Sequence, residues 1–274
     1  MGRLWDPLVE LLFPRRCVGC GAAGWPFCAG CLPRVARAGS PGCARCGRPL
    51  EWDVDRCSSC PRAPIAWARA AYVYEGPVRG AMMRLKFGGQ RSVVDALAPA
   101  TAAALASAPW AGERVPPAAL HPRSGRAPPR VAGVPADAVL TWVPLGSDRR
   151  RRRGYDQAEA LAHALSRLSG IPTVRLLVRT RETAPQARRS ATDRRRALEG
   201  AFDVRLGSRR ELPRRVVLVD DVLTTGATAA ACARALRGAG VREVGLVTAA
   251  RSLPEGVLAR CYTPPRVPGG GRGE

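Results

Sequence analysis

The stretch that decides the fold is Val216–Thr228, which reads VVLVDDVLTTGAT. Four apolar residues lead into the acidic pair Asp220 and Asp221, a Thr/Gly turn follows, and the alanine-rich run Ala229–Leu236 comes next. This order predicts a strand, a loop and a helix. An uninterrupted apolar strand is typical of a parallel sheet that is buried on both faces, so the sequence predicts an α/β fold.

The carboxyl end of this strand is the predicted ligand site, because ligands of open α/β sheets bind there. The small residues of the turn let backbone N–H groups approach a ligand, and the start of a helix favours a phosphate. Ionised Asp220 and Asp221 accept hydrogen bonds from ribose hydroxyls. The stretch therefore predicts a site for a phosphorylated ribose. The alternative is that the acidic pair only ends a strand and Thr228 only caps a helix.

Eight of the ten cysteines form four CxxC pairs in the first part of the chain. Two such pairs complete the tetrahedral sulfur site that zinc prefers, and four thiolates leave no position for water. A disulfide framework is the competing interpretation, but nothing in the sequence indicates secretion. We therefore predict one or two structural Zn²⁺ ions, with the ligands Cys17, Cys20, Cys28, Cys31, Cys43, Cys46, Cys57 and Cys60.

The pairing of these cysteines stays open at the level of sequence. Two consecutive sites are the simplest arrangement, because short gaps separate the first pair from the second and the third from the fourth. Interleaved pairs and a single occupied site are the alternatives.

The remaining chain predicts an organisation in segments. Strands are expected at 70–74, 138–143, 171–178, 201–204 and 241–249, and helices at 4–13, 78–85, 92–105 and 155–168. The fold class is then a mainly parallel sheet with flanking helices plus a small Cys-rich zinc module. The expected units are an N-terminal helix (1–14), the zinc module (15–66), a hood or linking segment (67–106), a flexible Pro/Gly/Arg insert (107–137), the α/β domain (138–263) and a disordered tail (264–274).

A basic loop follows the expected strand at 138–143. It contains five successive arginines, Arg149, Arg150, Arg151, Arg152 and Arg153. At the carboxyl end of a strand these side chains are placed to neutralise a polyanion, and the alternative is a solvated basic run.

The formal net charge is +22, and Lys86 is the only lysine in the chain. Such a charge attracts phosphates, including those of nucleic acid. Aromatic residues make up only 5%, so a stacking surface for single strands is thinly supplied. The sequence contains no run of eighteen apolar residues, so no membrane span is predicted. The N-terminal residues lack a signal-peptide pattern, and a cytoplasmic location is therefore expected.

Val216–Thr228 resembles the phosphoribosyl pyrophosphate (PRPP) signature of the type I phosphoribosyltransferases. The resemblance implies a catalytic pair, Asp220 and Asp221, that binds the ribose 2′ and 3′ hydroxyls, with Mg²⁺ accompanying PRPP. It also implies a 5′-phosphate loop made of Thr224, Thr225, Gly226, Ala227 and Thr228. The five arginines would then bind the pyrophosphate, and the polar segment 179–196 resembles the mobile loop that closes over the ligands.

The whole chain resembles the ComF family. The resemblance rests on the N-terminal cysteine cluster, the turn that leads to Leu85 and Lys86, the motif Arg153–Gln157, Gln186, and Ala201 with Phe202. The family motif commonly has Phe and Asn where this chain has Tyr155 and Asp156. The resemblance implies a role in the uptake of single-stranded DNA during natural transformation, with single-stranded DNA and proteins of the competence machinery as partners.

Two functional hypotheses follow. In the first, the protein is a Mg²⁺-dependent transferase that moves a phosphoribosyl group from PRPP to an acceptor. In the second, it is a non-catalytic competence protein that binds single-stranded DNA or partner proteins and uses the PRPP site for regulation.

Overall fold

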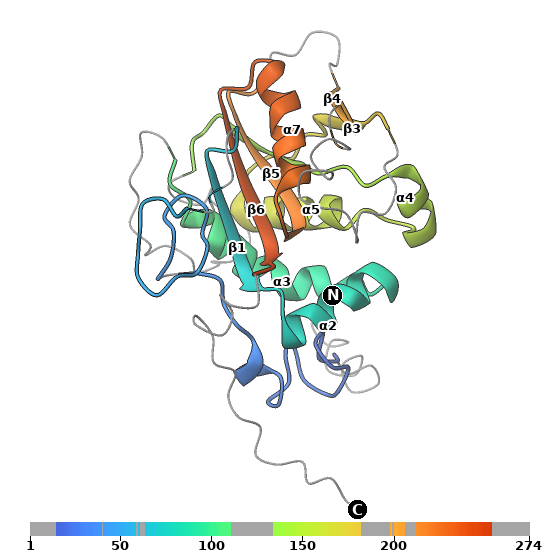
Figure 1. Cartoon of the computed structure of the whole chain (residues 1–274). Coiled ribbons are helices and arrows are strands. Elements are labelled where there is room, and N and C mark those ends of the chain that lie inside the picture. Colours follow the sequence, from blue (N-terminus) through green and yellow to red (C-terminus); the bar gives the residue numbers. More distant parts are fainter. Residues whose placement is uncertain are drawn as a thin grey trace, which may run out of the picture.

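Figure 1 shows the computed structural model, which describes residues 15–39, 41–58, 60, 64–110, 134–181, 198, 200–205 and 212–253. The expected N-terminal helix (4–13) and tail (264–274) lie outside these residues, as do most of the expected insert (107–137) and most of the segment 179–196. The zinc module and the α/β domain lie largely within them.

The main sheet has four parallel strands. They are β1 (Trp67–Val73), β2 (Ala138–Trp142), β5 (Arg215–Leu223) and β6 (Glu243–Arg251), and their order in the sheet is β1-β6-β5-β2. The first part of the stretch that decides the fold, Val216–Leu223, lies in β5, between two hydrogen-bonded neighbours. The parallel sheet confirms the predicted fold class. Residues 67–106, expected as a hood, contribute an edge strand to this sheet.

Helices cover both faces of the sheet (Figure 1). They are α3 (Ser92–Ala106) and α5 (Gln157–Ser169) on one face and α7 (Ala227–Gly238) on the other. Along β5, Val217 and Val219 pack with α3 and α5, whereas Val216 and Leu218 pack with α7. Fully burying each such side chain stabilises the fold by about 1.5–3 kcal/mol. Both faces of this strand need apolar residues, which explains the uninterrupted run.

The acidic pair lies inside β5 rather than after it, which corrects the sequence prediction. The ladder with β6 continues to Leu223, and Asp220 is opposite Thr248. On the other side, β2 pairs with β5 only as far as Val219. Beyond the point where this neighbour ends, the two carboxylates line a cavity while their backbone stays in the ladder with β6.

The strand expected at 171–178 is largely absent from the described structure. Only β3 (Leu177–Arg179) forms there, and it pairs antiparallel with β4 (Phe202–Val204) outside the main sheet. The preceding residues run beside β2, where Leu140 donates to the carbonyl of Pro172. Proline has no N–H for a regular ladder, and this limits the pairing.

The five arginines lie on a helix, α4 (Ser147–Arg153), where the sequence predicted a loop. Asp148 is in its first turn and the basic residues are in its last, an arrangement that complements the helix dipole. Gly154 ends the helix with a φ of 72°, a left-handed conformation that suits glycine.

The zinc module rests on α2 (Gly76–Phe87) and on the sheet. Arg84 donates to the carbonyls of Val18 and Gly19 in the first cysteine knuckle. Arg251, at the end of β6, donates to the carbonyl of Cys46 in the second. Each knuckle is therefore attached to the α/β domain through its own backbone.

The junction between β1 and β6 depends on one small residue. Trp67 is opposite Gly245, and a Cβ at that glycine would overlap the indole ring. The Trp67 side chain is 1% exposed and packs edge-on against Trp110, with ring centroids 4.9 Å apart. Glycine is thus required for packing in the middle of this strand.

Candidate functional site

A cavity of about 510 Å³ opens where β2 ends and β5 continues. Six residues of the predicted phosphoribose site line it, namely Asp220, Asp221, Thr224, Thr225, Ala227 and Thr228. Gly226 is the N-cap of α7 within the same loop. The structure thus brings the predicted residues together at one opening of the fold.

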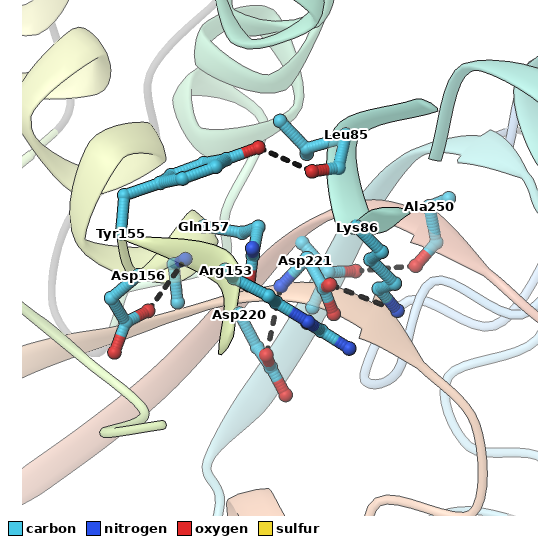
Figure 2. Close-up of polar contacts among 11 residues, drawn as sticks. Leu85, Lys86, Arg153, Tyr155, Asp156, Gln157, Asp220, Asp221 and Ala250 are labelled. Atoms are coloured by element: carbon cyan, nitrogen blue, oxygen red, sulfur yellow. Dashed lines mark hydrogen bonds and ion pairs between the residues drawn. The ribbon is translucent and has the colours of Figure 1, made fainter. Parts of the chain in front are cut away.

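Asp220 and Asp221 differ in their surroundings (Figure 2). The Oδ1 atom of Asp220 accepts a hydrogen bond from the backbone N–H of Asp221, at 2.8 Å. Burial and the neighbouring charge of Asp221 raise the pKa of Asp220 well above its ordinary range. The Oδ2 atom of Asp221 forms an ion pair with Lys86 Nζ, at 2.9 Å. The charge of Asp221 is therefore balanced by Lys86, whereas burial disfavours the ionised form of Asp220.

The start of α7 suits an anion. Gly226 has a φ of 73°, which turns the chain from the strand end into the helix, and no side chain caps the helix. Thr225 Oγ1 lies 3.4 Å from the N–H of Ala227, a long contact. The first N–H groups of a helix lack partners within it, so this terminus can donate to a phosphate.

The start of α5 lines the same cavity but is closed by its own cap. Asp156 is 4% exposed and accepts from the N–H groups of Ala158 (3.0 Å) and Glu159 (3.3 Å). Its other oxygen accepts from Leu145 N–H at 2.8 Å. Burial raises the pKa of Asp156, although these three N–H groups oppose the shift. Of these two helix termini, the one at α7 is thus the one left for a ligand.

The five arginines divide into two groups. Arg149 and Arg153 line the cavity. Arg150 pairs with Glu159 at 3.1 Å, Arg151 pairs with Asp148, and Arg152 is exposed away from the lining. The periodicity of a helix causes this division, because positions four apart share a face.

Three further polar residues line the site. The sequence places them in its motifs or in the expected mobile loop but assigns them no role in binding. Lys86 reaches it from the last turn of α2, Arg179 from the end of β3, and Gln157 from the start of α5. Gln157 Oε1 accepts from Arg153 NH1 at 2.9 Å, which orients that guanidinium. A signal for Lys86 was present, because it is the only lysine of the chain.

Charge in the cavity favours an anionic ligand. Its described lining holds four cations (Lys86, Arg149, Arg153 and Arg179) and three carboxyl groups (Asp156, Asp220 and Asp221). Burial lowers the pKa of Arg153, and the attraction of Asp221 opposes that shift. Because the pKa values of Asp156 and Asp220 are raised, the balance is more positive than the count alone indicates.

The cysteines form two consecutive groups, which settles their pairing. One comprises Cys17, Cys20, Cys28 and Cys31, the other Cys43, Cys46, Cys57 and Cys60, and within each the sulfur atoms lie within 4.8 Å of one another. The Cys43–Cys60 and Cys46–Cys57 sulfurs are 3.4 and 3.6 Å apart. Zn–S bonds of about 2.3 Å in a tetrahedron require sulfur–sulfur edges of about 3.8 Å, so the geometry fits zinc.

Each cysteine group favours the thiolate form of one member and disfavours it in another, because burial and the neighbouring sulfurs raise the pKa of Cys31 and of Cys60. Burial opposes the charge of Cys17, but hydrogen bonds from Cys28, Cys20 and Gly19 lower its pKa to about 6. Burial likewise opposes the charge of Cys43, and backbone hydrogen bonds lower its pKa to about 6. All four positions of each site would be filled by sulfur, so the zinc ions are structural.

These features define a protein class: a phosphoribosyltransferase-type domain joined to a zinc module. Comparison with family models agrees, because residues 8–61 match the double zinc ribbon domain and residues 152–259 match the phosphoribosyl transferase domain.

Curated relatives identify the family. Competence protein F of Haemophilus influenzae is 32% identical over 240 residues, which cover 85% of this chain and 95% of that protein. DNA utilization protein YhgH of Escherichia coli K12 is 32% identical over 84% of this chain and 92% of its own length. Competence protein ComFC of Bacillus subtilis is 24% identical over 76% of this chain and 77% of its own. The chain belongs to the ComF family. In the part of it that the structure describes, no helix is both long and apolar enough to cross a membrane.

Proposed function

We propose that this protein binds PRPP together with Mg²⁺ in the cavity at the end of β5. One observation carries the proposal: the uncapped start of α7, the acidic pair and two arginines all lie at the same cavity. The N–H groups around Thr225–Thr228 would bind the 5′-phosphate. Asp220 and Asp221 would accept from the ribose hydroxyls, and Arg149 with Arg153 would bind the pyrophosphate.

The donor set also fits Mg²⁺. This cation prefers oxygen ligands and is often bound by one or two carboxylates together with phosphate oxygens. Asp220 and Asp221 supply such oxygens, and a nearby cation would favour the ionised form of Asp220. When bound, Mg²⁺ would neutralise charge on the pyrophosphate.

Transfer would follow from positioning rather than from a strong side-chain base. An acceptor's nucleophilic atom would bond to the ribose C1, the bond from C1 to the pyrophosphate oxygen would break, and pyrophosphate would leave with that electron pair. The proton of the acceptor would pass to solvent. Arg149 and Arg153 would stabilise the charge that develops on the leaving group, the kind of preorganised contribution that dominates many enzymes.

The relatives support a cellular role in the uptake or use of DNA, because they are described as competence and DNA utilization proteins. Single-stranded DNA and proteins of the competence machinery are the partners we propose. In the alternative form of this function, the cavity regulates DNA or partner binding without turnover. The formal charge of +22 favours contact with nucleic acid in either case.

Calorimetric titration with PRPP and Mg²⁺ tests the ligand. We expect the double variant Asp220→Asn/Asp221→Asn to lose at least about tenfold in affinity, because hydrogen bonds to charged groups contribute roughly 1.5–3 kcal/mol each. Asp95→Asn, which changes an exposed carboxylate on α3, is the matched control and should bind as the parent does. Equal affinity of the parent and the double variant would exclude the assignment.

Pyrophosphate release in the presence of candidate acceptors distinguishes the transferase from the binder. For DNA, the salt dependence of single-strand binding should become shallower when Arg149–Arg153 are replaced by glutamine, because fewer counterions are released. An unchanged slope would place the DNA contact elsewhere on the protein.

A further inference from the structure

Lys86 holds a position that the proposed ligand needs. Its ammonium lies 2.9 Å from Asp221 Oδ2, and the two side chains are only 21% and 16% exposed. Burial opposes the charged ammonium, but the attraction of Asp221 and the hydrogen bond to it outweigh burial, so the pKa of Lys86 is raised. The ion pair thus occupies the carboxylate that ribose hydroxyls or a divalent cation would otherwise contact.

The backbone of Lys86 is held on both sides. Tyr155 OH donates to the carbonyl of Leu85, and the Arg153 guanidinium lies over the ring of Phe87, 5.3 Å from its centroid. Both contacts attach the end of α2 to the segment that carries the arginines, and Figure 2 shows the one between Tyr155 and Leu85. Only the flexible four-carbon stem of Lys86 is therefore free to exchange one anionic partner for another.

The residue type matters in a chain with 44 cationic side chains and a single lysine. Arginine forms bidentate pairs with carboxylates, whereas lysine is a compact charge on a flexible stem. A lysine can therefore neutralise Asp221 and still release it, while an arginine at the same position would bind both carboxylate oxygens.

We infer that Lys86 is the counter-ion of Asp221 in the ligand-free site and that PRPP with Mg²⁺ displaces it, after which its ammonium binds the ligand's phosphate oxygens. This inference rests on the proposed function. The inference also predicts that the metal and PRPP bind together rather than one after the other. The Lys86 ammonium repels a free divalent cation from Asp221, so the metal does not bind tightly on its own. The negative ligand supplies Lys86 with its new partner.

Two titrations with the Lys86→Met variant test the exchange. Without PRPP, Mg²⁺ should bind at least about tenfold more tightly than to the parent, because its competitor for Asp221 is gone, whereas PRPP with Mg²⁺ should bind at least about tenfold more weakly. Mn²⁺ paramagnetic resonance gives a second measure of the metal. Lys86→Arg should keep metal binding weak, and Lys86→Gln serves if the methionine variant does not fold. Shifts of both affinities in the same direction, or no shift, would overturn the inference.

The single lysine also permits a chemical readout. An amine acylating reagent can modify only Lys86 and the N-terminal amine, and peptide mass spectrometry separates the two sites. Without ligand, acylation of Lys86 should be slow in the parent and fast in Asp221→Asn. In the parent it should stay slow when PRPP and Mg²⁺ are added, because the ammonium then contacts phosphate oxygens. Faster acylation of the parent on addition of PRPP would contradict the new contact. If the parent binds no PRPP, the proposed function fails, yet the Mg²⁺ titration still decides whether Lys86 competes for Asp221.

Discussion

Asp156 supports a sharp prediction because its three hydrogen bonds fix both the start of α5 and the strand-to-helix loop before it. In Asp156→Ala, the loss of a helix cap costs about 1 kcal/mol. The freed, partly buried Leu145 N–H costs roughly another 1–3 kcal/mol. Relief from burying a carboxyl whose pKa is raised offsets part of this. We therefore expect a loss of about 2 kcal/mol in the free energy of unfolding.

Chemical and thermal denaturation of the zinc-loaded protein measure this loss. For a protein of this size, 1 kcal/mol shifts the melting temperature by about 2–4 °C, so a fall of roughly 4–8 °C is expected. Asp148→Ala is the matched control, because that exposed carboxylate pairs with an exposed Arg151 and its loss should cost less than about 1 kcal/mol. A loss below about 0.5 kcal/mol in Asp156→Ala would show that these hydrogen bonds do not hold the loop.

Asp156→Asn separates the hydrogen bonds from the charge. Its carbonyl can still cap α5, but it binds no proton. Because the folded pKa of Asp156 is raised above the ordinary 3.8, the folded state keeps its proton when the unfolded state has lost it. The stability of the parent relative to Asp156→Asn should therefore be greatest below about pH 4 and fall as the pH rises through the raised pKa.

Three further predictions concern other parts of the molecule. Metal analysis of the reduced protein should give two zinc ions per chain, and Cys17→Ser or Cys43→Ser should each remove one. PRPP affinity should fall in Arg149→Gln/Arg153→Gln but not in a variant with glutamine at 150, 151 and 152, since only the first pair lines the cavity. Gly245→Ala should destabilise the fold by about 1–3 kcal/mol or prevent folding, because its methyl group overlaps Trp67; a melting temperature equal to that of the parent would contradict the packing.

Much of the site follows from local sequence. The uninterrupted apolar run Val216–Val219 predicts a doubly buried strand, and its side chains do pack against helices on both faces of the sheet. Each cysteine group forms from pairs close in the chain. By contrast, the contact between Lys86 and Asp221 joins distant segments, and no local pattern encodes which side chain meets the acidic pair.

Other differences between the predicted and the observed elements could have been found from the local sequence. Asp156 followed by Glu159 has the spacing of a capping box, which places the start of α5 two residues after the predicted one. Asp148 before the arginines indicates a short helix through its dipole, but five like charges resemble a solvated run. The end of β5 depends on where its neighbours stop, and a strand's own sequence does not contain that information.

The contact from Arg251 to the carbonyl of Cys46 has a consequence for biosynthesis. The two residues are 205 positions apart. At roughly 5–20 residues per second, the second knuckle leaves the ribosome about 10–40 s before its anchor is made. During that interval the knuckle depends on the bound metal and on local hydrogen bonds, such as those from Cys43 N–H to Arg48 and from Ala44 N–H to Val54. Zinc that binds during translation should therefore stabilise the knuckle before its contact with Arg251 can form.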